Sequence, residues 1–167
     1  AQKPKRPSID FSKWGPVIKK PMTQMRKTIA KAMSDSWENV PRITQFDDIP
    51  LSHAMALRKK HVADYEAAGT RLTVTTLVIK ALANTLVKNP EFNTSLDENT
   101  GELIYKQYYH MGIAVDTEHG LMVPVLRNVD QKNLLEISKD LQEMAEKTRS
   151  RKVSLEEMQG ASFTISN

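Results

Sequence analysis

The sequence predicts an α+β layered domain. Three observations lead to this fold class. Apolar residues recur at helical spacing in several segments, short apolar and β-branched runs in others have the character of strands, and the central runs follow one another without crossover helices. A chain of 167 residues is also long enough to bury a sizeable hydrophobic core.

Residues 1–20 are predicted to form a basic, semi-rigid linker, because they show neither the helical nor the strand periodicity of apolar residues and contain Pro4, Pro7 and Pro16. Residues 1–31 hold nine Lys or Arg and one acidic residue, whereas the rest of the chain holds 15 basic and 19 acidic groups. Such an arm is also compatible with nucleic-acid binding. The chain contains no recognisable nucleic-acid module, so we favour the linker and expect the folded domain to span residues 21–167.

The first periodic element is an amphipathic helix that ends near Asn39, ahead of Pro41. Its apolar stripe consists of Met22, Met25, Ile29, Met33 and Trp37. Residues 42–48 then form a strand candidate. A second helix is predicted over residues 51–67 and is closed by Gly69.

A third helix, over residues 74–88, is apolar on most faces and therefore predicts burial on several sides. A turn cluster at 96–101 follows, and it introduces three strand candidates at residues 102–106, 109–116 and 120–126. The last two are joined by a glycine-containing hairpin connection.

A fourth helix is predicted over residues 132–147 from its apolar stripe. A short fifth helix opens on Ser154, with Glu157 three residues later in the pattern of a capping box. The final strand begins after Gly160 and runs to the end of the sequence.

Composition restricts the class of protein. The chain has no cysteine, which excludes disulfides and thiolate chemistry within it and suits a cytoplasmic protein. No apolar run approaches the roughly 18 residues of a membrane helix, so no membrane association is expected. The six glycines are scattered singly, which argues against a phosphate-binding loop.

Residue patterns alone leave the chemistry open. The four histidines, His53, His61, His110 and His119, are candidates for acid–base chemistry. None has the spacing of a helical metal pair, and solvated or packed roles are favoured for all four. No metal site is predicted. The cluster Arg58-Lys59-Lys60 presents three consecutive cations and suits a phosphate-bearing ligand, although the residues alone favour an ordinary solvated helix face.

Five stretches, taken in order, resemble the dihydrolipoamide acyltransferases of 2-oxo-acid dehydrogenase complexes. They are residues 9–15, 40–46, 112–116, 120–132 and 160–166. The first two look most like the acetyl-transferring members of pyruvate dehydrogenase complexes. The resemblance implies a layered domain similar to chloramphenicol acetyltransferase, with helices on a mixed sheet. It also implies acyl exchange, with acetyl as the expected group, between coenzyme A and a dihydrolipoyl group carried on a separate lipoyl domain.

The resemblance further implies a homotrimer that assembles into a larger core with the other components of such a complex. It assigns two residues by alignment. Ser166 matches the family's oxyanion-stabilising serine, and Arg58 matches an arginine at the phosphate end of coenzyme A. A serine hydroxyl in this role stabilises the tetrahedral oxyanion that forms when a thiol attacks a thioester.

The family's general base is a histidine in an Asp-His-Arg motif near its C-terminus, and this motif is absent from the 167 residues. We therefore expect the domain to be incomplete at its C-terminus and the chain alone to lack acetyltransferase activity. A fragment, a truncated protein and a naturally short one all agree with this pattern. The alternative function is a non-catalytic structural or scaffolding protein of the same kind of complex.

Overall fold

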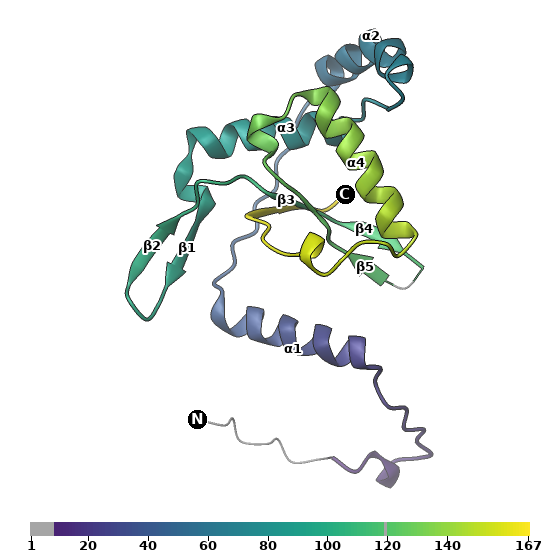
Figure 1. Cartoon of the computed structure of the whole chain (residues 1–167). Coiled ribbons are helices and arrows are strands. Elements are labelled where there is room, and N and C mark those ends of the chain that lie inside the picture. Colours follow the sequence, from purple (N-terminus) through teal and green to yellow (C-terminus); the bar gives the residue numbers. More distant parts are fainter. Residues whose placement is uncertain (1–8, 119) are drawn as a thin grey trace. The chain divides into compact units, whose positions relative to one another are not determined.

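The computed structural model describes residues 9–118 and 120–167 (Figure 1). The chain divides into two compact units, residues 1–48 and residues 49–167. The predicted linker at residues 1–20 lies partly outside the described residues. Within its described part, Phe11–Lys13 form a single 3₁₀ turn, η1, which Asp10 caps by accepting a hydrogen bond from the backbone N–H of Ser12 at 3.1 Å.

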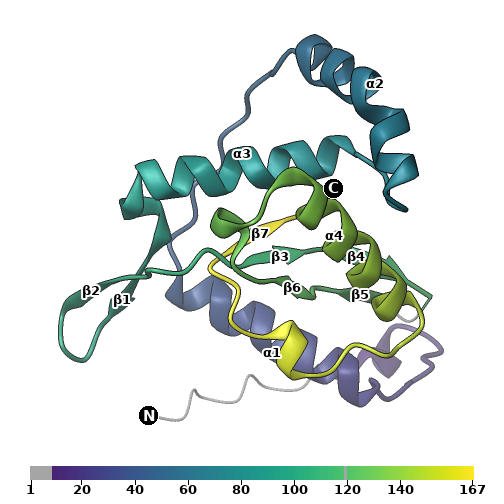
Figure 2. The ribbon, with the colours of Figure 1, turned by 45° about the horizontal axis from the view of Figure 1, so that its top comes forward.

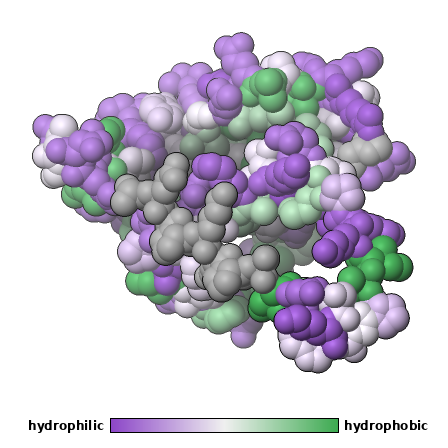
Figure 3. All heavy atoms as spheres, turned by 90° about the horizontal axis from the view of Figure 1, so that it is seen from below, coloured by the Kyte–Doolittle hydropathy of each residue, from purple (hydrophilic) through white to green (hydrophobic). Residues whose placement is uncertain are grey.

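The described part of the first unit contains one long helix, α1 (Gln24–Asn39), which confirms the predicted amphipathic helix. Thr23 caps it by accepting a hydrogen bond from the backbone N–H of Arg26. The apolar stripe remains exposed: Met25 is 58% and Trp37 74% accessible. On the face of the molecule that Figure 3 draws, hydrophobic residues lie beside hydrophilic ones at the surface.

The strand predicted at residues 42–48 is wrong. This segment has neither helix nor strand, and Ile43 and Phe46 are 96% and 91% exposed. A β-strand exists through hydrogen bonds to a neighbouring strand. No other segment among the described residues of the first unit offers such a partner, so the β-branched and aromatic composition of 42–48 does not produce a strand.

The described residues of the second unit form three long helices, as predicted. They are α2 (Ser52–Ala67), α3 (Val74–Lys88) and α4 (Leu134–Arg149). Thr73 caps α3 by accepting a hydrogen bond from the backbone N–H of Thr76 at 3.1 Å. At α4 the cap is Asn133, and a reciprocal capping box with Glu136 completes it.

Seven short strands accompany these helices in the part of the chain that the structure describes. The hairpin of β1 (Thr94–Asp97) and β2 (Glu102–Tyr105) turns at the predicted cluster, although β1 itself was not predicted. A second hairpin joins β4 (Val115–Thr117) to β5 (Gly120–Met122). The three strands of the main sheet are β3 (Met111–Ile113), β6 (Val125–Leu126) and β7 (Phe163–Ile165).

The main sheet is mixed and has the order β6-β3-β7. Strand β3 pairs antiparallel with β6, with Met111 opposite Leu126. On its other side β3 pairs parallel with β7, and Met111 lies opposite Phe163 there. The final strand predicted after Gly160 is therefore confirmed, and it lies beside the central strand of the sheet.

Helices α3 and α4 cover one face of this sheet (Figure 2). The hydrophobic core lies between them and the strands, and it includes Ile79 and Leu86 of α3, Met111 of β3 and Ile137 of α4. Each of these four side chains is at most 2% exposed. The third helix contacts α2, α4 and the short 3₁₀ turn η3 (Val129–Gln131). The burial predicted for several of its sides is only partly found, because its buried residues lie three and four positions apart on one face, whereas Val78 and Val87 are 43% and 48% exposed.

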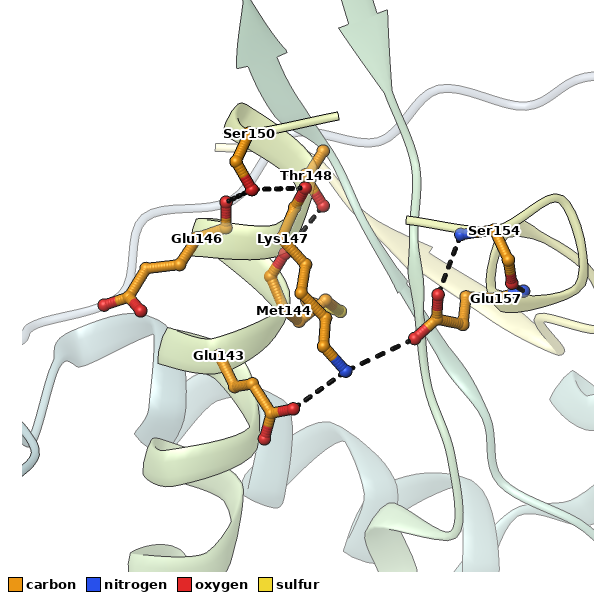
Figure 4. A network of polar contacts seen from close by, with 8 residues as sticks. All are labelled: Glu143, Met144, Glu146, Lys147, Thr148, Ser150, Ser154 and Glu157. Atoms are coloured by element: carbon orange, nitrogen blue, oxygen red, sulfur yellow. Dashed lines mark hydrogen bonds and ion pairs between the residues drawn. The ribbon is translucent and has the colours of Figure 1, made fainter. Parts of the chain in front are cut away.

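A polar network anchors the segment that leads from α4 to β7 (Figure 4). Lys147 of α4 binds Glu143 at 2.8 Å and reaches Glu157 at 3.6 Å. Glu157 and Ser154 form the predicted capping box, because each side chain accepts a hydrogen bond from the other residue's backbone N–H. The helix that it opens is only one 3₁₀ turn, η4 (Glu156–Met158).

Among the described residues, the helices are all too short or too polar to cross a lipid bilayer.

Candidate active site

Ser166 follows β7 directly and is solvent-exposed. The strand before it is held in the sheet, where Ile165 lies opposite Ile113 and its carbonyl accepts a hydrogen bond from the backbone N–H of Ala114 at 2.9 Å. The Ser166 hydroxyl has no hydrogen-bond partner among the described residues. A hydroxyl group without a protein partner is free to donate its hydrogen to a ligand.

A hollow of about 370 Å³ lies beside the end of β7. Ile165 and Asn167, the two neighbours of Ser166, both line it, whereas Ser166 itself does not. Its walls come from the first turn of α3, from β3 and β4, and from α4. The polar side chains in these walls are Thr73, Thr75, Asp116 and Arg149. The hollow therefore combines an apolar wall with a few polar groups, which is the usual character of a ligand site.

Arg58 lies on α2 and is half-buried. Its Nε donates a hydrogen bond to the carbonyl oxygen of Leu72 at 3.0 Å. This bond leaves the terminal Nη groups of the guanidinium without partners among the described residues. Lys59 and Lys60, the other two cations of the cluster, are exposed.

The structure does not bring Arg58 and Ser166 into one hollow. Arg58 lines a small hollow of about 40 Å³, together with Val62, Glu66, Arg71 and Leu72. A larger hollow of about 510 Å³ shares Arg71 with it, and shares Thr73, Leu141, Ala145 and Arg149 with the hollow beside β7. The three hollows thus adjoin one another along the surface of the second unit.

Two arginines in this row of hollows, Arg71 and Arg149, were not singled out from the sequence. Arg71 lies between Thr70 and Leu72, which are 4% and 3% exposed. Arg71 itself is exposed, and this pattern of burial becomes visible only in the structure. No comparable local pattern marks Arg149, whose place in the hollow depends on the packing of α4.

A further hollow of about 220 Å³ lies between α4 and the segment that precedes β7. Most of the charged side chains that line it form ion pairs with one another. Lys132 binds Asp140 at 2.6 Å, and Lys147 binds Glu143 at 2.8 Å. Because these charges are already paired, we do not place the candidate site there.

The described histidines have structural or solvated surroundings, as the sequence suggested. His53 is exposed on α2, and His61 lies one turn from Asp64, with Nδ1 at 3.0 Å from its carboxylate. Nδ1 of His110 accepts a hydrogen bond from the backbone N–H of Asn128 at 3.1 Å. Burial lowers the pKa of His110 below its usual value. His119 lies outside the described residues.

Across residues 9–118 and 120–167, no three His, Cys, Asp or Glu side chains gather in a group that could hold a metal ion. The polar groups beside Ser166 and around Arg58 are hydroxyl, guanidinium, isolated carboxylate and amide groups. Hydroxyl and guanidinium donors suit oxyanions and phosphates rather than cations.

Residues 15–167 match the family described as 2-oxoacid dehydrogenases acyltransferase (catalytic domain). A similar protein is the dihydrolipoyllysine-residue acetyltransferase component of the pyruvate dehydrogenase complex from Azotobacter vinelandii. It is 46% identical over 159 residues, which make up 95% of this chain and 25% of that protein.

Two solved structures are also similar, each with a TM-score of 0.87 over 98% of this chain and 67% of the other. One belongs to a study of the role of a serine, a histidine and an asparagine in the catalytic mechanism of A. vinelandii dihydrolipoamide acetyltransferase, at 46% identity. The other is the cubic core of the pyruvate dehydrogenase multienzyme complex, at 45% identity.

The fold is therefore that of an acyltransferase catalytic domain, and the predicted α+β class is confirmed. The chain belongs to the 2-oxoacid dehydrogenase acyltransferase family. It spans about a quarter of the length of the A. vinelandii protein.

Proposed function

We propose that this chain forms part of an enzyme that transfers an acyl group between coenzyme A and dihydrolipoyl groups. The acyl group that we expect is acetyl. Family membership over residues 15–167 supports the proposal. The observation that carries it is the position of Ser166, which has an unpartnered hydroxyl, follows a strand secured beside the centre of the sheet, and has two chain neighbours that line a hollow.

The reaction is the exchange of a thioester. The attacking thiol loses its proton, and its sulfur forms a bond to the carbonyl carbon. The carbonyl oxygen then carries the negative charge of a tetrahedral intermediate, which collapses as the bond to the leaving sulfur breaks and that sulfur takes a proton. In our proposal the Ser166 hydroxyl donates a hydrogen bond to this oxygen and thereby lowers the barrier.

The attacking thiol needs a general base, because only a few per cent of it is thiolate at neutral pH. His110 is unsuited to this role, since its Nδ1 already accepts the Asn128 N–H. The related A. vinelandii enzyme was studied for a histidine as well as a serine in its mechanism. We therefore assign the base to a histidine outside these 167 residues, in keeping with the family's Asp-His-Arg motif.

The coenzyme A substrate is assigned to the face that carries Arg58. Two features of this residue suit a phosphate: the Nε bond to Leu72 fixes the side chain, and the two Nη groups remain free for a bidentate contact. We further propose a lipoyl domain as the carrier of the second substrate and a homotrimer within a larger core. Cytoplasmic location suits this use of coenzyme A.

The test is acetyl transfer from acetyl-CoA to dihydrolipoamide by the full-length protein, with and without the substitution Ser166→Ala. We expect kcat to fall by about 10²–10³, because one oxyanion donor is lost. Ser162→Ala is the matched control, since the Ser162 hydroxyl is already hydrogen-bonded to the His110 backbone, whereas the Ser166 hydroxyl has no partner among the described residues. Wild-type turnover in Ser166→Ala would remove the serine from the mechanism, and absence of transfer in the unsubstituted full-length protein would favour the scaffolding role.

A further inference from the structure

We propose that Arg71 is a second phosphate-binding residue, which acts beside Arg58 on the phosphate groups of coenzyme A. This inference rests on the proposed function, because it names the part of the substrate that this face of the molecule would bind. Both arginines line the same small hollow between α2 and the loop that leads to α3.

The backbone around Arg71 is fixed. Thr70, 4% exposed, donates its hydroxyl hydrogen to Oε1 of Gln142 in α4 at 3.2 Å, and its backbone N–H binds the carbonyl of Tyr65. Leu72 is 3% exposed. One buried residue on each side thus holds the backbone of Arg71 in place, while Arg71 itself is exposed.

The same loop positions Arg58. Its Nε donates to the carbonyl oxygen of Leu72 at 3.0 Å, so the guanidinium of Arg58 is tied to the residue that follows Arg71. Through this hydrogen bond, the guanidinium of Arg58 is held at the same short stretch of backbone that carries Arg71. Two like charges kept together at a surface repel each other unless an anion lies between them.

Neither guanidinium is neutralised by an ion pair in the described part of the chain. Arg71 has no hydrogen-bond or ion-pair partner there, and Arg58 has only the Leu72 carbonyl. Glu66 of α2 lines the same hollow, but its carboxylate forms no salt bridge with either arginine. The hollow therefore offers free donors with the planar geometry that binds phosphate oxygens in pairs.

The closing experiment uses the full-length protein and measures both KM for coenzyme A in acyl transfer and direct binding of coenzyme A by calorimetry. For Arg71→Met we expect KM and Kd to rise about tenfold, the typical effect of one charge-assisted hydrogen bond, with kcat unchanged. Arg71→Lys should recover part of the affinity. Glu66→Gln should act in the opposite direction and tighten binding, because it removes the competing carboxylate.

Lys60→Met is the control for net charge, since it removes one cation from exposed α2 without touching the hollow. A rise in KM for Lys60→Met equal to that for Arg71→Met, or no change for Arg71→Met, would overturn the inference. The same measurement with 3′-dephospho-coenzyme A shows which phosphate Arg71 contacts. If Arg71→Met no longer raises KM and Kd, the contact is to the 3′-phosphate; if it still does, the contact is to the diphosphate. Binding that depends on Arg71 in a protein without transfer activity would refute the proposed function but not this site.

Discussion

The backbone N–H of Asn128 donates a hydrogen bond to Nδ1 of His110 at 3.1 Å. Asn128 has a left-handed backbone conformation with φ of 53°, and it stands immediately before the turn η3. The His110 backbone also contacts Ser162, whose N–H donates to the His110 carbonyl at 2.8 Å. One residue thus connects the start of β3, the loop after β6 and the segment before β7, which leads to Ser166.

This contact predicts a loss of stability in acid. An Nδ1 that accepts a hydrogen bond must be unprotonated, and burial lowers the pKa of His110, with the charges of Arg127 and Lys132 adding to the effect. A backbone hydrogen bond at Tyr109 and the charge of Asp130 oppose it. At pH values above about 6.5, the pKa of histidine in the unfolded chain, His110 is unprotonated in both the folded and the unfolded state and does not change the free energy of unfolding. As the pH falls below that value, the unfolded chain gains the proton more readily, so the free energy of unfolding decreases.

His110→Asn keeps an acceptor near Nδ1 but does not titrate. We expect the free energy of unfolding to fall less between pH 7.5 and pH 5.5 in this variant than in the unsubstituted protein, as measured by chemical denaturation. His53→Asn, on the exposed surface of α2, is the matched control and should keep the full decrease. An equal decrease in His110→Asn would show that other groups cause the acid effect.

Gly112 predicts a packing defect on substitution. A Cβ added at this residue would lie 3.0 Å from both Oγ1 of Thr164 and Cγ1 of Val123, and 3.3 Å from Cβ of Ala161. Gly112 pairs with both neighbours in the middle of the sheet, opposite Val125 and Thr164, so the strands must separate to make room. Overpacking of this kind costs about 1–3 kcal/mol.

We therefore expect Gly112→Ala to lower the free energy of unfolding by that amount in chemical denaturation. Ser95→Ala is a change of similar size on the exposed hairpin and should stay within about 0.5 kcal/mol of the unsubstituted protein. Equal stability of the two variants would mean that the sheet relaxes around the added methyl group.

The helices were predictable because their signals are local. Thr73 and Asn133 precede α3 and α4 in the sequence, and the structure uses both as caps. The apolar residues of α3 likewise indicated that it packs on the core, although only one of its faces is buried. These features depend on residues three or four positions apart, which a single sequence displays directly.

The strands were less predictable, because a strand depends on its partner. The segment Thr94–Asp97 becomes β1 only through its pairing with Glu102–Tyr105, and its composition resembles a turn. Residues 42–48 have the composition of a strand but no partner in the described part of their unit. Only tertiary packing distinguishes these two cases.

The candidate site was predictable in part and for a different reason. Ser166 and Arg58 were identified through a family resemblance, since an exposed serine and a cationic helix are common in any protein. Arg71 became visible only when the structure showed that Thr70 and Leu72 on either side of it are buried. The free donors of a binding surface depend on which neighbours are already paired, and the sequence does not state this.

The cap of α4 predicts a defined loss of stability. The Asn133 side chain accepts hydrogen bonds from the backbone N–H groups of Leu135 at 2.9 Å and Glu136 at 3.0 Å, and the Glu136 carboxylate accepts the Asn133 N–H at 2.7 Å. Asn133→Ala removes the first two bonds and should lower the free energy of unfolding by about 1 kcal/mol in chemical denaturation. Asn133→Asp retains an acceptor and should restore most of it, whereas equal losses in both variants would argue against the capping interpretation.

The last prediction concerns Lys147, which ties α4 to the segment that leads to β7 (Figure 4). Its hydrogen bond and charge interaction with Glu143 are the main causes of its raised pKa, and the interaction with Glu157 contributes less. The side chains are 43–65% exposed, so salt should screen these pairs. Lys147→Met should therefore increase hydrogen exchange at residues 153–158 in low salt, and the difference should vanish in about 1 M salt, where the Debye length is about 3 Å.

Lys139→Met is the matched control, because Lys139 lies exposed on the same helix without an ion pair among the described residues. It should leave exchange at residues 153–158 unchanged at both salt concentrations. Since the Ser154–Glu157 capping box remains in Lys147→Met, the segment should loosen without unfolding. Increased exchange that persists in high salt would instead indicate that the aliphatic part of Lys147, rather than its charge, holds the segment against α4.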